Sequence, residues 1–130
     1  NNFVRTVMRL AGEREELGVV FDQVGTPTYT ADLAKAVAAL MEAGRPGTYH
    51  FSNEGVASWY DFAHEIVGRM KEKGSVPLKL RTLKPILTEE YPTPARRPNY
   101  TVMHKGKYKK TTGREVPHWK DALKRFMDTL

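Results

Sequence analysis

The sequence predicts an α/β fold, because segments with helical and strand-like patterns alternate along it. Apolar residues recur at helical spacing in four segments, and short stretches typical of strands lie between them. With 130 residues, 40% of them hydrophobic, the chain is long enough for one hydrophobic core and too short for two. We therefore expect one small domain of helices and strands.

The first part of the chain is predicted to run helix, strand, helix. Residues 1–11 place apolar side chains on one broad face, and residues 17–21 are short and β-branched enough for a strand. Thr30 is expected to cap the next helix, with Asp32 in its positive first turn. Gly44 is expected to end that helix, because glycine readily adopts the left-handed conformation found there.

The middle of the chain continues the alternation. Residues 48–52 predict a strand. Ser58, with Asp61 three residues later, predicts the start of a helix that Gly74 ends. The apolar face of this helix is the strongest periodic signal in the chain: Trp59, Phe62, Ala63, Ile66, Val67 and Met70.

The last third of the chain combines a strand, a proline-rich loop and a helix. Residues 76–83 alternate leucines with basic residues, which predicts a half-buried strand. Four prolines in residues 84–99 argue against a regular helix or a central strand there. Residues 100–103 predict a short strand, and Pro117 is expected to open a final amphipathic helix.

Composition narrows the class of protein. The chain has no run of about 18 apolar residues, and its lack of cysteine excludes disulfides and fits a reducing cytoplasm. It begins in a helical pattern without a methionine, which suggests a piece of a longer protein. The net charge of +6 favours an anionic partner, and much of the excess lies in Arg96–Arg97 and in residues 105–110.

No catalytic constellation stands out. The four histidines are too scattered for a metal motif, no serine lies in a Gly-x-Ser-x-Gly turn, and we predict no metal ligands. The ten glycines never form Gly-x-Gly-x-x-Gly, and no tyrosine is followed by a lysine four residues later. The residues therefore indicate a binding domain.

Two loops are candidates for binding. Residues 91–99 hold three prolines beside Arg96 and Arg97, and this stiffness lowers the entropy cost of placing a guanidinium against a phosphate. Alternatively, this is a surface turn whose arginines pair with nearby carboxylates. In residues 22–29, Gln23 offers a donor and an acceptor to a base or sugar hydroxyl, although an ordinary strand-to-helix turn explains the same pattern.

Five stretches, in the same order and spacing, resemble the dTDP-4-dehydrorhamnose reductases. They are Asn-Phe-Val-Arg-Thr at 2–6, the stretch from Asp-Gln-Val-Gly-Thr-Pro at 22–34, Gly-Thr-Tyr-His-Phe-Ser-Asn-Glu-Gly at 47–55, Ser-Trp-Tyr-Asp-Phe-Ala at 58–63 and the loop 91–99. The resemblance covers nearly the whole chain. It implies the carboxy-terminal portion of an extended short-chain dehydrogenase of the NAD(P)-binding Rossmann superfamily, without the amino-terminal Rossmann half.

The resemblance also implies an activity. Such an enzyme uses NADPH or NADH, bound mainly outside this chain, and a Tyr-Lys pair to reduce the C4 ketone of dTDP-4-dehydro-L-rhamnose to dTDP-L-rhamnose. Residues 1–130 would then be the sugar-nucleotide-binding domain of a cytoplasmic enzyme, inactive on their own because they lack that pair. Dependence on Mg is left undetermined.

By the same resemblance, nine residues are expected to contact the dTDP-sugar. Asn2 and Phe3 would approach the sugar nucleotide, and Arg97, Pro98 and Asn99 would close the pocket near the diphosphate. The remaining residues would line the pocket: Gln23, Gly25, Pro27 and Thr28.

Two other functions remain as alternatives. One is a non-catalytic regulatory subunit of the same fold, like that of methionine adenosyltransferase. The other is a nucleic-acid-binding module, suggested by Lys105, Lys107, Lys109 and Lys110. No stacking aromatics accompany these lysines, so we expect a short helix with a solvated basic face, and neither a nucleic-acid nor a membrane partner.

Association between copies is a further expectation. It would form a homo-oligomer or use the interface left open where the Rossmann half is missing. There Val7, Leu40 and Met41 are expected to lack partners, and the strand at 48–52 is expected to expose an edge.

Overall fold

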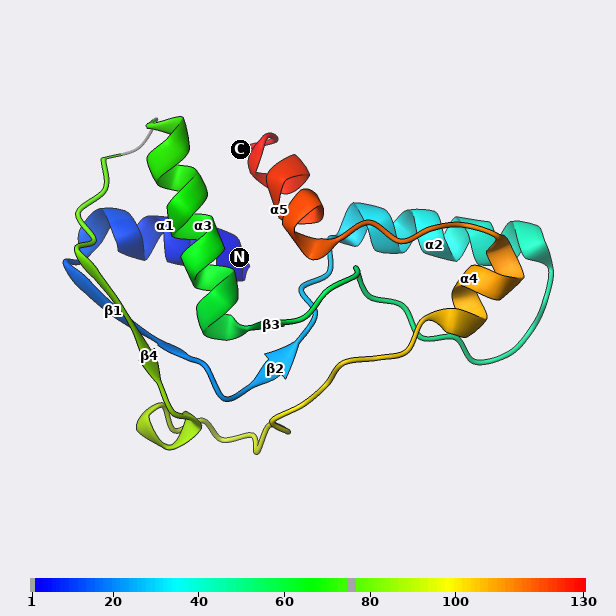
Figure 1. The fold of residues 1–130 in the computed structure, drawn as a ribbon, viewed down its shortest axis with the longest axis horizontal. Helices are drawn as coiled ribbons and strands as arrows, with labels where there is room; N and C mark the ends of the chain where they lie inside the picture. Colours follow the sequence, from blue (N-terminus) through cyan, green and yellow to red (C-terminus); the bar gives the residue numbers. More distant parts are fainter. Residues whose placement is uncertain (1, 75–76) are drawn as a thin grey trace. The chain divides into compact units, whose positions relative to one another are not determined.

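The computed structural model describes residues 2–74 and 77–130, which form an α/β structure as predicted (Figure 1). Its contacts divide the chain into two compact units, whereas the length predicts one core. Unit 1 comprises Asn1–Val24 and Ala57–Tyr100, and unit 2 comprises Gly25–Val56 and Thr101–Leu130. Each unit is built from two stretches that are distant in sequence, which no local pattern reveals.

Unit 1 contains a parallel pair of strands, β1 (Glu16–Val20) and β4 (Thr82–Ile86). They lie side by side in Figure 1, in a register that runs from Glu16 opposite Thr82 to Val20 opposite Ile86. The strand near residues 17–21 is thus confirmed. Both strands end at the same edge, which brings the loops that follow them together.

A strand was predicted at residues 76–83, but the observed strand, β4, lies further along the chain. Residue 76 of the predicted strand lies outside the described residues. Lys79 and Leu80 donate their backbone N–H groups to the carbonyl of Ala11 instead of to a strand, and the ladder begins only at Thr82. β4 also includes Pro85, inside the proline-rich stretch expected to be irregular. This is tolerated because, among the described residues, β4 pairs on one side only.

Two helices of unit 1 pack against each other, α1 (Phe3–Glu13) and α3 (Trp59–Lys73). Their predicted apolar faces are confirmed, with these side chains buried: Val4, Val7 and Ala11 from α1, and Ala63, Ile66, Val67 and Met70 from α3. Val7 is only 2% exposed, so the expectation that it lacks partners was wrong. Packing of α1 within unit 1 already covers it.

The predicted capping of α3 is confirmed at both ends. The Ser58 hydroxyl accepts from the Asp61 N–H at 3.0 Å, and Asp61 Oδ2 accepts from the Ser58 N–H at 2.9 Å. Aspartate closes the reciprocal pair as the more common glutamate does. At the other end, Gly74 adopts φ +60°, the left-handed conformation that glycine favours.

Loss of this cap has a measurable consequence. We expect Ser58→Ala to lower the free energy of unfolding by about 1 kcal/mol, because the N–H of Asp61 loses its acceptor. Urea denaturation followed by circular dichroism measures the change. Asp61→Glu, which replaces aspartate with the more common capping partner, is the control and should keep the urea midpoint of the wild type. An unchanged urea midpoint in Ser58→Ala would contradict the assignment of the cap.

Unit 2 contains three helices, α2 (Thr30–Ala43), α4 (Gly106–Thr112) and α5 (Trp119–Met127). A buried cluster of Ala36, Tyr108 and Val116 has Leu40 and Phe51 packed against it. Leu40 therefore has partners within unit 2, contrary to expectation. Met41 is 77% exposed, and with the exposed Leu33 and Val37 it forms an apolar stripe on α2. Association between copies through this stripe stays a prediction.

Two strands expected in the sequence do not form. Residues 48–52 make no ladder with any described segment, and the Phe51 side chain packs against the cluster around Tyr108. Residues 100–103 contribute only an isolated bridge between Tyr100 and Val24. The remaining strands are the two-residue β2 (Val24–Gly25) and β3 (Ala57–Ser58), which pair with each other. A strand requires a partner backbone, and the pattern of one segment cannot supply it.

Two helix starts also differ from expectation. α2 begins at Thr30 itself, with Tyr29 as its N-cap, and the Tyr29 N–H donates to the side chain of Asn53. α5 begins at Trp119 rather than at Pro117, because His118 caps it with Nδ1 accepting from the Lys120 N–H at 3.2 Å. Gly44 ends α2 as predicted, at φ +60°.

The expected short helix forms at the basic stretch 105–110 as α4, and Lys107 and Lys110 are exposed, but Lys105 and Lys109 do not belong to a solvated basic face. Lys105 is only 7% exposed and lies 3.3 Å from Glu54, while Lys109 lies 2.7 Å from the same carboxylate. This ion pair lowers the pKa of Glu54 and raises the pKa of Lys109. Lys107 donates to the Thr48 carbonyl. Three of the four lysines, Lys105, Lys107 and Lys109, thus make polar contacts within unit 2.

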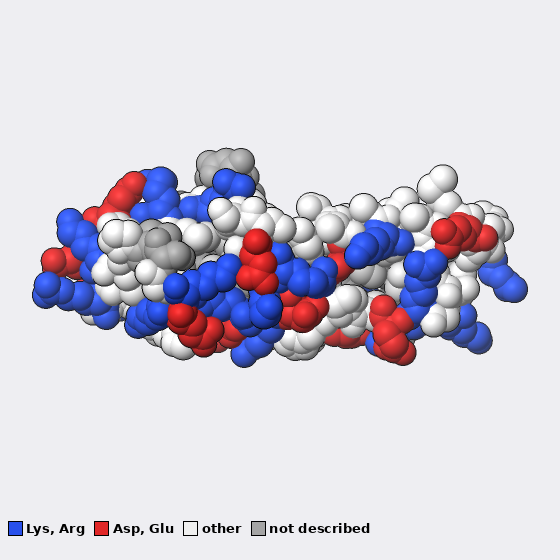
Figure 2. Space-filling model, turned by 90° about the horizontal axis from the view of Figure 1, so that it is seen from above, with Lys and Arg blue, Asp and Glu red and all other residues white. Residues whose placement is uncertain are grey.

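The surface drawn in Figure 2 interleaves Lys and Arg side chains with Asp and Glu side chains. The net positive charge therefore does not form one continuous basic patch on that face. None of the helices among residues 2–74 and 77–130 is both long and apolar enough to cross a membrane.

Candidate functional site

The carboxyl ends of β1 and β4 carry a group of polar residues in unit 1. Asp22 and Gln23 follow β1, and Thr88 follows β4 in a short 3-10 helix (Thr88–Glu90). Asp22 Oδ1 accepts from the Thr88 N–H at 2.9 Å and from its hydroxyl at 2.7 Å, while Gln23 Nε2 donates to the Thr88 hydroxyl at 3.1 Å. With Asn99, these residues form what we call the strand-end cluster.

The hydrogen bonds from Thr88 hold Asp22 in its ionised form. They lower the pKa of the Asp22 carboxyl below its ordinary value of 3.8. A carboxylate of this kind accepts hydrogen bonds at neutral pH and does not supply protons. Asp22 therefore serves to fix the geometry of the strand ends.

Asn99 attaches the proline-rich loop to this cluster. Its Nδ2 donates to the Asp22 carbonyl at 3.1 Å, and its own carbonyl accepts from the Val24 N–H at 2.8 Å. The two residues before it in the chain are Arg97 and Pro98. The structure thus brings Gln23, Asn99 and the end of the loop to one edge of unit 1, and their contact with a ligand stays a prediction.

The two arginines of the loop are exposed, as is every residue of 91–99. Within the described part of the chain, no carboxylate forms an ion pair with Arg96 or Arg97. The alternative in which these arginines only pair with neighbouring carboxylates therefore gains no support. A planar guanidinium with free donors is suited to a phosphate.

Asn2 and Phe3 take part in a different set of contacts in unit 1. Asn2 caps α1, with Oδ1 accepting from the Arg5 N–H at 3.0 Å. The ring of Phe3 lies 4.8 Å from that of Trp59 and is stacked 5.4 Å from that of Phe62. Capping thus accounts for the side-chain oxygen of Asn2. Contact of either residue with a ligand stays a prediction.

The remaining predicted residues, Gly25, Pro27 and Thr28, belong to unit 2. A Cβ on Gly25 would lie 2.6 Å from the Thr101 hydroxyl, so a larger residue there would force the Thr101 side chain to move. Pro27 is half-buried, and the exposed Thr28 donates its hydroxyl to the Thr26 carbonyl at 3.2 Å. Thr28 is the most accessible of the three.

Three of the described helices have starts that disfavour the pyrophosphate of a dinucleotide. An anion binds best where backbone N–H groups are free and no negative side chain lies beside them. The first turns of α2, α3 and α5 instead carry Asp32, Asp61 and Asp121. We therefore assign no step of cofactor chemistry to these three helix starts. Nor do three His, Asp or Glu side chains gather as metal ligands within the described ranges.

Reasoning from the sequence missed the supporting residues of both loops. Thr88 and Asp22 hold the strand ends, but their bond joins residues 66 positions apart. Asn53 likewise supports Tyr29 across 24 positions. The only local signal was that Asp22 directly follows a predicted strand.

An α/β domain with a stiff, arginine-bearing loop at the ends of parallel strands is of the ligand-binding class. Residues 1–130 match the family model described as the RmlD substrate binding domain. The chain belongs to this family.

Relatives of similar sequence agree with this membership. The chain is 38% identical to a dTDP-4-dehydrorhamnose reductase of Escherichia coli K12, with all of the chain and 45% of the relative covered. It is 42% identical to the spore coat polysaccharide biosynthesis protein SpsK of Bacillus subtilis 168, with 98% of the chain and 42% of the relative covered. The chain thus spans less than half the length of these relatives.

A solved structure gives the same result for the fold. The dTDP-4-dehydrorhamnose reductase of Bacillus anthracis, crystallised in complex with NADP, superposes with a TM-score of 0.87 at 37% identity. The alignment covers 100% of this chain and 44% of that one.

Proposed function

We propose that residues 1–130 are the sugar-nucleotide-binding domain of a longer enzyme, a dTDP-4-dehydrorhamnose reductase. It would reduce the C4 ketone of dTDP-4-dehydro-L-rhamnose to dTDP-L-rhamnose, a polysaccharide precursor, in the cytoplasm. The observation that carries this proposal is the match of all 130 residues to a substrate binding domain family. Relatives named as this reductase support the substrate.

The strand-end cluster supplies a physical role for this chain. Arg97 would bind the diphosphate, because no carboxylate among the described residues pairs with it and Asn99 anchors the loop next to it. Gln23 would offer a donor and an acceptor to the base or sugar. These residues bind and orient the substrate, and neither supplies a proton or an electron.

The reducing cofactor would be NADPH or NADH, held mainly by residues outside this chain, as would the catalytic Tyr-Lys pair. The complex of the Bacillus anthracis relative with NADP supports a nicotinamide cofactor. The absence of a Gly-x-Gly-x-x-Gly motif from residues 1–130 supports this placement of the cofactor.

Calorimetric titration tests the proposal. We expect dTDP to bind saturably to the polypeptide that carries this chain, and inorganic phosphate to compete with it only weakly. A protein of residues 1–130 alone should not oxidise NADPH in the presence of dTDP-4-dehydrorhamnose. Absence of saturable dTDP binding in the longer polypeptide would overturn the proposed substrate. Turnover by residues 1–130 alone would overturn the placement of the catalytic pair and the cofactor site outside this chain.

A further inference from the structure

An irregular segment of unit 2, residues 52–55, makes many polar contacts although it belongs to no helix or ladder. Asn53 is fully buried, at 0% exposure, and Ser52 is 2% exposed. Glu54 pairs with Lys105 and Lys109, and its backbone exchanges hydrogen bonds with Pro117 and Trp119. Burial of so many polar groups is tolerated only when each has a partner.

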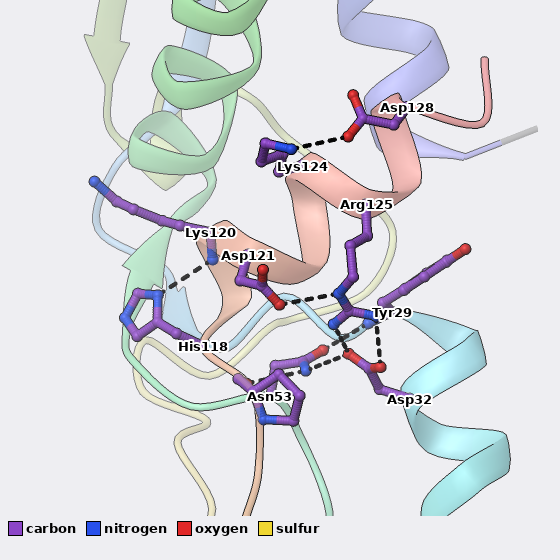
Figure 3. A network of polar contacts seen from close by, with 10 residues as sticks. Tyr29, Asp32, Asn53, His118, Lys120, Asp121, Lys124, Arg125 and Asp128 are labelled. Carbon is purple, nitrogen blue, oxygen red and sulfur yellow. Dashed lines mark hydrogen bonds and ion pairs between the residues drawn. The ribbon is translucent and has the colours of Figure 1, made fainter.

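Asn53 uses both ends of its amide. Oδ1 accepts from the Tyr29 N–H at 2.8 Å, while Nδ2 donates to Asp32 at 2.8 Å and to the Pro117 carbonyl at 3.1 Å. Figure 3 shows the Asn53 side chain beside both Tyr29 and the Asp32 carboxylate, and Arg125 reaching the same carboxylate from α5. The position of Tyr29 thus depends on a network that reaches α5.

The same segment also holds the other end of the turn that precedes α2. The Thr26 hydroxyl donates to the Gly55 carbonyl at 2.8 Å. Gly55 has φ +87° and lies against the ring of His118, so no other residue fits well there. The turn 26–29 is therefore attached at its first and last residues to one short segment, at the buried Asn53 and the half-buried Gly55.

Between these two attachments lie Pro27 and Thr28. Proline fixes its own φ angle, and Thr28 is exposed with its hydroxyl close to the Thr26 carbonyl. A turn held in this way loses little conformational entropy when it meets a ligand.

We propose that Thr26 and Asn53 are positioning residues, which hold Pro27 and Thr28 in the geometry that contacts a dTDP-sugar. This inference rests on the proposed function, since it takes the sugar nucleotide as the ligand of the turn. Neither residue touches the ligand; they act through the turn. Their effect is on substrate affinity and not on the affinity for the nicotinamide cofactor.

Thr26→Val is the main test, because valine has nearly the shape of threonine and removes only the hydroxyl. In the longer polypeptide that carries this chain, we expect the Kd for dTDP and the KM for dTDP-4-dehydrorhamnose to rise about three- to tenfold. The KM for NADPH should stay unchanged, and the melting temperature should fall by at most a few degrees, because one hydrogen bond is lost. Thr26→Ser, which keeps the hydroxyl, should restore the Kd.

Amide hydrogen exchange tests the attachment separately from the ligand. In Asn53→Ala, the Tyr29 amide should exchange faster, while the amides of α3 in unit 1 keep their protection. If Asn53→Ala does not fold, exchange at Thr28 and Tyr29 in Thr26→Val provides the same measurement.

The outcomes separate two failures. If the wild-type protein does not bind dTDP, the proposed function fails, and with it the ligand assigned to the turn. If dTDP binds but Thr26→Val leaves its Kd unchanged, or raises the KM for NADPH equally, the positioning role is overturned. Unchanged exchange at Tyr29 in a folded Asn53→Ala would overturn the attachment itself.

Discussion

Replacing Asp32 with alanine is expected to destabilise the protein by about 3 kcal/mol, the lower end of the cost of breaking a buried ion pair from one side, because the Arg125 side chain is 35% exposed. The Asp32 side chain is 4% exposed, and both oxygens accept from Arg125, at 2.8 and 2.6 Å. It also accepts from Asn53 at 2.8 Å. Alanine would leave the guanidinium and the amide without this partner inside unit 2.

Asp121 offers a matched control, because it also pairs with Arg125, at 2.9 Å, but is 57% exposed. Asp121→Ala should cost less than about 1 kcal/mol, since an exposed ion pair contributes little. Urea denaturation of both variants measures the two costs. Equal, small costs would mean that the Asp32 pair is not a buried one in solution.

The same ion pair predicts a dependence on pH. The hydrogen bond from Arg125 lowers the pKa of Asp32 below its ordinary value of 3.8. The unfolded chain therefore binds this proton more readily, and the contribution of Asp32 to stability is present above pH 3.8 and lost as the pH falls below it. We expect the stability gap between wild type and Asp32→Asn to shrink in that range, and a constant gap would contradict the sign.

Arg97→Ala is expected to weaken dTDP binding by about 1.5–3 kcal/mol, which is roughly tenfold to a hundredfold in Kd. Arg97 is exposed, has no carboxylate partner among the described residues and directly precedes Pro98 and the anchored Asn99. A charge-assisted contact with the diphosphate would be lost. Calorimetric titration with dTDP gives the change directly.

Two controls separate a local contact from a general effect of charge. Arg14→Ala removes the same charge from an exposed position after α1 and should leave the Kd for dTDP unchanged. Arg97→Lys keeps the charge but not the planar fork, and should fall between wild type and Arg97→Ala. If Arg97→Ala binds dTDP like wild type, Arg97 belongs to an ordinary surface turn.

Family membership could be predicted from the sequence, because five stretches in register are visible without coordinates. The candidate site could be predicted only in part. Arg97, Asn99 and Gln23 were identified, and the structure places Asn99 and Gln23 in one cluster around Asp22 and Thr88. The support from Thr88 was missed, since a threonine after an unrecognised strand end carries no signal of its own.

By itself, the sequence determined the features that depend on residues within a turn or two of each other. These include the apolar face of α3, its capping by Ser58 and Asp61, and the left-handed glycines that end α2 and α3. Periodicity and capping involve neighbours three or four residues apart, so the pattern and its cause lie in the same short segment.

Only the tertiary structure decided which distant segments meet. It paired Val20 with Ile86, gave residues 48–52 no ladder with any described segment and joined Asp32 to Arg125 across 93 positions. A strand or a buried charge requires a partner, and the choice among partners depends on how whole segments pack and exclude water. That choice is made by the folded chain as a whole, and no local pattern records it.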